Sequence, residues 1–200
     1  MQPAERKRPF YLVVALLGAL ALGAHAASSG WGLVAAYRGN LDARQVERGV
    51  TDDADRARIT ARIEMLIATL DAAKRRGWPL SVATMVIGTA VAVFAMRALG
   101  GNGGARAALV QLIVVQAGID SASHWLLRDV ERAEISAQQA LDSASSHDAP
   151  SEPNRAAQAA SMLAVSLGLR LLGSALVVVA LTRRRSRDFF DAMAAAVEER

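Results

Sequence analysis

The amino-acid sequence predicts an all-α membrane protein, with four transmembrane helices in a bundle and amphipathic helical segments outside the membrane. The first observation is composition, because 52% of the 200 residues are apolar and four long stretches hold almost no charge. The second is length, because a helix crosses the hydrocarbon core with roughly 20 apolar residues and pairs all its backbone groups there. The third is that the charged residues are concentrated between these apolar stretches. In a soluble helical protein, by contrast, charged and apolar residues alternate along each helix with the helical period.

The charge pattern also predicts orientation and segment boundaries. Lys and Arg gather before the first span and after the last, as they do on cytoplasmic flanks, although the basic run at 74–76 opposes this orientation. We expect a multi-pass protein of a bacterial-type inner membrane with both termini cytoplasmic. The predicted segments are a cytoplasmic N-terminus (1–9), spans at 10–27, 78–99, 107–127 and 156–182, extracytoplasmic segments at 28–77 and 128–155, a cytoplasmic turn (100–106) and a cytoplasmic amphipathic tail (183–200).

The first span has an alternative interpretation as a secretory signal. A basic start and an apolar run precede Ala24-His25-Ala26, which has the small-x-small pattern of a cleavage site. The uncharged stretch continues to Tyr37, however, which is long for a signal peptide. We therefore expect the first span to be retained, with cleavage as the alternative.

The first outer segment contains an apolar stripe at helical spacing, which predicts an amphipathic helix. We expect this helix to end near Gly77, with Pro79 in the first turn of the next span. The stripe needs a partner, which is the membrane surface, the other outer segment or another protein. Its residues are Ile59, Ile63, Leu66 and Leu70.

The later segments show weaker patterns. The second outer segment begins as a helix and then loosens into a loop around 143–150. The tail carries a short apolar stripe that we expect to lie on the inner membrane face, formed by Phe189, Phe190, Met193 and Val197. Small residues recur at every fourth position in three spans, for example at Gly23 and Gly88, which predicts close helix packing.

The two halves of the chain also resemble each other. The segment 87–91 aligns without gaps with 172–176, and Trp31 aligns with Trp125. This pattern favours a duplicated two-span unit, but apolar helices rich in Ala, Val, Leu and Gly resemble one another by composition alone. Duplication stays one of two alternatives.

One polar constellation lies inside the predicted membrane region. Asp120 lies 14 residues after Arg106, and Arg170 lies 13 residues before Arg183, so both are roughly 20 Å from the inner boundary. A lone charge at that depth costs at least about 2.5 to 3.5 kcal/mol, so we expect the two to pair. The pair is either structural or handles a proton, ion or ligand. Supporting polar residues are Gln116, Ser123, Ser166 and Ser174.

Other site chemistries have little support in the sequence. His25 and His124 have similar predicted depths, so they are weak candidates for axial ligands of a b-type haem. Cysteine is absent, which excludes disulfides and thiolate metal sites. Basic residues lie at span ends rather than among aromatics, which argues against nucleic-acid binding. No phosphate-binding loop or hydrolase motif occurs.

The sequence thus favours a non-enzymatic interaction, accessory or sensory subunit. Its expected partners are the lipid bilayer and either another protein or a second copy, with the stripe at 59–70 as the docking surface. The alternatives are a small transporter or proton path through Asp120 and Arg170, and a haem-binding electron carrier.

Overall fold

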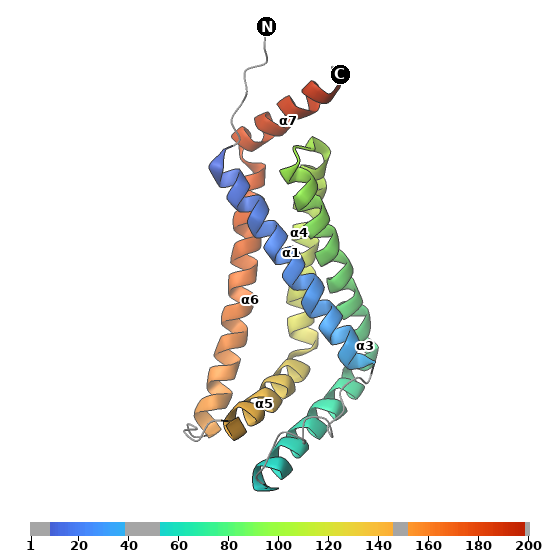
Figure 1. Cartoon of the computed structure of the whole chain (residues 1–200), viewed down its shortest axis with the longest axis vertical. Helices are drawn as coiled ribbons and strands as arrows, with labels where there is room; N and C mark the ends of the chain where they lie inside the picture. Colours follow the sequence, from blue (N-terminus) through green and yellow to red (C-terminus); the bar gives the residue numbers. More distant parts are fainter. Residues whose placement is uncertain (1–8, 39–52, 146–151, 199–200) are drawn as a thin grey trace. The chain divides into compact units, whose positions relative to one another are not determined.

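The computed structural model describes residues 9–38, 53–145 and 152–198, and nearly all of these residues are helical (Figure 1). Four helices have the length and composition of membrane spans, over Phe10–Tyr37, Ile59–Leu99, Gly103–Leu126 and Ala164–Thr182. The prediction of an all-α chain with four spans is therefore confirmed. The described helices are α1 (Phe10–Tyr37), α3 (Asp53–Leu99), α4 (Gly103–Leu126), α5 (Arg128–Ser145), α6 (Glu152–Thr182) and α7 (Arg184–Glu198).

The chain divides into two compact units. Unit 1 comprises Met1–Gly30, Ala83–Ile119 and Gly168–Arg200, and unit 2 comprises Trp31–Val82 and Asp120–Leu167. Each of α1, α3, α4 and α6 contributes residues to both units.

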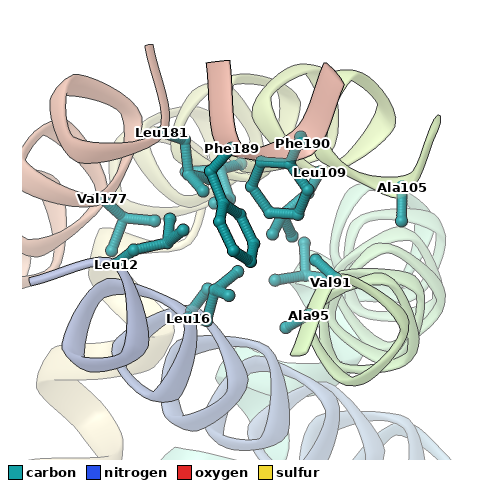
Figure 2. Close-up of a cluster of buried hydrophobic side chains, with 13 residues drawn as sticks. Leu12, Leu16, Val91, Ala95, Ala105, Leu109, Val177, Leu181, Phe189 and Phe190 are labelled. Atoms are coloured by element: carbon teal, nitrogen blue, oxygen red, sulfur yellow. The ribbon is translucent and has the colours of Figure 1, made fainter. Parts of the chain in front are cut away.

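The core of unit 1 is built from parts of all four spans together with α7. Figure 2 shows the rings of Phe189 and Phe190 pointing from α7 toward side chains of α1 and α3. The two rings pack edge to face, with centroids 5.5 Å apart. The buried residues are Leu12, Leu16, Ala19, Val91, Ala95, Ala98, Ala105, Leu109, Ile113, Val177, Leu181, Phe189 and Phe190.

This packing corrects the expected position of the tail stripe. Phe189 and Phe190 are buried and Met193 packs against the same core, so these side chains do not lie on the membrane surface. The cause is the apolar space where the four spans meet, which the two aromatic rings fill. The side chain of Val197 lies outside the described residues.

The core of unit 2 gives the outer stripe a partner within the chain. Ile59, Ile63, Leu66 and Leu70 are all buried. Leu66 and Leu70 belong to a cluster that draws most of its other members from the start of α5. Of the three partners that the sequence left open, the structure therefore places the second outer segment on the Leu66 and Leu70 part of the stripe. The other cluster members are Tyr37, Leu127, Val130, Ala133 and Ala137.

The expected helix end at Gly77 is wrong, because α3 runs unbroken for 47 residues with Pro79 inside it. The missing side chain at Gly77 serves packing instead, since a Cβ there would collide with the hydroxyl of Tyr37. The Ser81 hydroxyl donates to the Gly77 carbonyl at 2.8 Å, within the turn that contains Pro79. A proline removes one helical hydrogen bond, but the turns on either side of it continue the helix here.

Other boundaries differ less. α1 extends past the predicted span end at residue 27 to Tyr37, and α4 begins at Gly103 rather than at Ala107. The turn before α4 contains Gly101 with φ of +90°, a conformation that favours glycine. The N-terminal basic residues 6–8 and most of the predicted loop at 143–150 lie outside the described residues.

Candidate intramembrane polar site

Gln116 is the best-defined polar residue in unit 1. Its side chain is buried on α4, and its Nε2 donates to the Leu22 carbonyl oxygen of α1 at 3.5 Å. Its Oε1 is buried without a partner among the described atoms. Ser174 of α6 is buried in the same unit. The sequence predicted that Gln116 is a polar residue supporting the Asp120–Arg170 pair, and the structure shows a hydrogen bond from Gln116 that ties α4 to α1.

Arg170 is half-buried on the part of α6 that belongs to unit 1. In the described part of that unit, acidic residues occur only in α7, at Asp188, Asp191 and Glu198. No ion pair between Arg170 and these residues is present in unit 1 as described. The described spans of unit 1 thus supply no carboxylate for Arg170.

The predicted counter-ion belongs to the other unit. Asp120 is half-buried on the part of α4 that lies in unit 2. Ser123, also in unit 2, has a buried hydroxyl without a partner among the described atoms, and Ser166 of the same unit is exposed. The pairing of Asp120 with Arg170 stays a prediction.

The environment of Arg170 is unusually open. None of the residues 168–173 is buried, and Leu169 and Leu172 are 64% and 57% exposed. A Cβ at Gly168 would meet no atom within 4 Å. In the most apolar part of the α6 span only 11% of the residues are buried, compared with 33% in the most apolar part of the α1 span. The α6 span, Ala164–Thr182, therefore presents a largely uncovered surface, and Arg170 is the one charged residue within that span.

The two histidines lie in different units and have different surroundings. His25 is exposed on the part of α1 that belongs to unit 1. His124 lies in unit 2, where its Nδ1 is 3.0 Å from Oε2 of Glu131 across the break between α4 and α5. The sequence analysis missed this pair, although a histidine and a glutamate flanking a helix break were a usable signal. A haem held by these two histidines stays a prediction.

Other titratable groups give no metal site. Among the described residues, no group of three or more His, Cys, Asp or Glu side chains is placed to hold a metal ion. On α5, desolvation by neighbouring protein atoms raises the pKa of the Glu134 carboxyl above its ordinary value, although the side chain keeps an exposed surface.

The fold and these residues define an all-helical protein with four candidate membrane spans. No protein-family model, curated protein or solved structure matches the chain.

Proposed function

We propose that this protein is a non-enzymatic accessory subunit that binds a partner protein's transmembrane helix along α6. The partner helix carries a carboxylate, which pairs with Arg170. The observation that carries this proposal is a half-buried arginine on an uncovered part of a span whose own unit offers no carboxylate within the membrane.

The physical argument rests on desolvation. A charged side chain deep in hydrocarbon is unfavourable by at least about 2.5 to 3.5 kcal/mol, and pairing with an opposite charge offsets that penalty. The exposed Leu169 and Leu172 offer apolar contact beside the charge. Gly168 has open space around it, so a second helix can approach closely there.

Asp120 of the same chain is the competing counter-ion. An Asp120–Arg170 pair within the chain would be structural, or would form part of a proton path, and would leave α6 without a charge to recruit a partner. Pairing of Arg170 with Asp120 and pairing of Arg170 with a partner protein predict different effects of substitutions on partner binding.

Photo-crosslinking tests the proposal directly. A photoreactive amino acid replaces Leu169, and the matched control places it at Leu109, which is fully buried in the core of unit 1. We expect crosslinking of a partner protein from Leu169 and none from Leu109. The captured chain, identified by mass spectrometry, must carry Asp or Glu within a span, and its Asn or Gln variant must lose capture.

Variants of the two charged residues complete the test. Arg170→Leu should abolish capture, Arg170→Lys should retain it, and Asp120→Asn should leave it intact. Capture of lipid alone, or a product with twice the mass of this chain, overturns the proposal of a different partner protein. Equal loss of thermal stability in Arg170→Leu and Asp120→Asn, without loss of a partner, would indicate the pair within the chain.

We also propose that the protein is inserted in a bacterial-type inner membrane with both termini cytoplasmic, which the distribution of Lys and Arg supports. The natural chain has no cysteine, so single cysteines report sidedness without background. Ala195→Cys on α7 should be protected from a membrane-impermeant maleimide in intact cells, and Asp71→Cys on α3 should be labelled. The reverse pattern would contradict the orientation.

A further inference from the structure

Basic residues gather at one end of the spans in unit 1. Arg97 lies in the last turn of α3, Arg106 in the first turns of α4, and four more arginines lie where α6 leads into α7. Figure 1 shows α7 at the same end of unit 1 as the turn between α3 and α4. The four are Arg183, Arg184, Arg185 and Arg187.

The joint between α6 and α7 is held by polar contacts. Ser186 is fully buried, and its hydroxyl donates to the Ala180 carbonyl at 2.7 Å. The hydroxyl of Tyr11 lies 3.1 Å from the Ser186 oxygen. Arg106 donates from Nη1 to the Leu181 carbonyl at 3.3 Å. These contacts fix the start of α7 on the end of the spans.

One arginine of the joint also contacts an aromatic ring. The guanidinium carbon of Arg183 lies 5.7 Å from the centroid of the Tyr11 ring, which is cation–π distance. Arg106 and Arg183 therefore already have contacts within unit 1. They act as parts of the joint.

The other three arginines of the joint differ from Arg106 and Arg183 in their surroundings. Arg184, Arg185 and Arg187 are exposed, and none of them pairs with a carboxylate in the described part of the chain. Phe189 and Phe190 fix the opposite face of α7 in the core. The apolar span of α6 ends at Thr182, so these arginines follow the hydrocarbon boundary directly.

We propose that Arg184, Arg185 and Arg187 form a binding surface for the phosphates of anionic lipid headgroups. A guanidinium binds phosphate with two parallel hydrogen bonds, and basic residues beside a span are attracted to anionic membrane surfaces. The three side chains are exposed and follow one another along the start of α7, so they suit a layer of headgroups better than one free phosphate. This inference is independent of the proposed function.

The test uses the full chain purified in a non-ionic detergent. Native mass spectrometry counts bound lipids after addition of phosphatidylglycerol or phosphatidylcholine. The test variant is R184Q/R185Q/R187Q, and the matched control is K74Q/R75Q/R76Q, which neutralises three exposed basic residues of α3 in unit 2. Thermal unfolding without added lipid checks that both variants fold.

The wild-type chain should bind phosphatidylglycerol in preference to phosphatidylcholine. The R184Q/R185Q/R187Q variant should lose at least about tenfold in apparent affinity for phosphatidylglycerol, whereas the α3 variant keeps most of it. The proposal is overturned if the two variants lose equally, if the wild type shows no preference, or if inorganic phosphate at the same concentration displaces the lipid.

A salt titration of the wild-type chain gives a second measurement that does not depend on any variant folding. The Debye length shrinks from about 10 Å at 0.1 M to about 3 Å at 1 M salt, so binding through exposed arginines must weaken. A preference for phosphatidylglycerol that is unchanged in 1 M salt would contradict the proposal.

Discussion

Gly23 of α1 and Gly88 of α3 pack backbone against backbone in unit 1. A Cβ on Gly23 would lie 2.7 Å from the Gly88 carbonyl oxygen, and a Cβ on Gly88 would lie 2.8 Å from the Gly23 carbonyl oxygen. The backbones of the two helices therefore approach each other directly at this point, which is the close approach that small residues permit in membrane helices.

A methyl group at this crossing should weaken the packing of α1 on α3. We expect Gly23→Ala to destabilise the protein by about 1 to 3 kcal/mol, because backbone atoms must move apart. Gly32→Ala on the same helix is the control, since a Cβ there would meet no atom within 4 Å. Thermal unfolding in detergent measures both, and equal midpoints would contradict the crossing.

The packing of α7 in the core predicts that removal of one aromatic ring strongly lowers the stability of the protein. Phe190 is 1% exposed, so Phe190→Ala should destabilise the protein by about 3 to 5 kcal/mol. Phe10 is 82% exposed, and Phe10→Ala should change stability little. The comparison uses the same thermal unfolding measurement. A Phe190→Ala variant as stable as Phe10→Ala would mean that α7 does not pack in the core.

The contact of Tyr37 with Gly77 predicts that two substitutions interact. Gly77→Ala alone should destabilise unit 2, because the new methyl group meets the Tyr37 ring. In a Tyr37→Ala background that obstacle is gone, so Gly77→Ala should then have almost no further effect. Chemical denaturation of the four proteins of this cycle measures the coupling, and additive losses would show that the two residues do not touch.

Glu134 predicts a pH dependence of stability. Desolvation by neighbouring protein atoms raises the pKa of this partly exposed carboxyl, so the folded chain holds its proton to a higher pH than the unfolded chain. The stability from this group is fully present below the unfolded pKa and is lost as the pH rises through the folded pKa. Glu134→Gln should remove that loss, so its stability relative to wild type should be higher at pH 7 than at pH 4.

Ser136→Ala provides the control for the pH measurement. It is a neutral change on the same helix, and it removes only a hydroxyl bond to the Ala133 carbonyl. Its effect on the unfolding midpoint should be the same at every pH. A Glu134→Gln profile parallel to wild type would contradict the raised pKa.

The spans and the small-residue crossing were predictable because they depend on local composition and spacing. The continuity of α3 was not, because Gly77 and Pro79 are typical of a helix end when they are considered alone. The space that Gly77 provides for Tyr37 depends on a residue 40 positions away in the sequence. Local signals could not supply that contact.

The candidate site was likewise predictable only where local sequence decides it. Counting residues gives the depth of Asp120 and Arg170, because a helix has a fixed rise per residue. Which helix a side chain faces depends on the rotation of neighbouring helices, so the hydrogen bond from Gln116 to α1 was missed. The stripe at 59–70 was correctly identified as apolar, and its periodicity alone could not choose α5 over the other partners.

The position of α7 ties the end of the chain's last span to the other three. Phe189 and Phe190 are members of the core that all four spans share in unit 1, so α7 cannot leave that core without exposing both rings. A Cβ at Gly103 would lie 3.4 Å from Cβ of Ala194, close to the separation in a disulfide. In this cysteine-free chain, a disulfide between Gly103→Cys and Ala194→Cys would join α7 covalently to the start of α4.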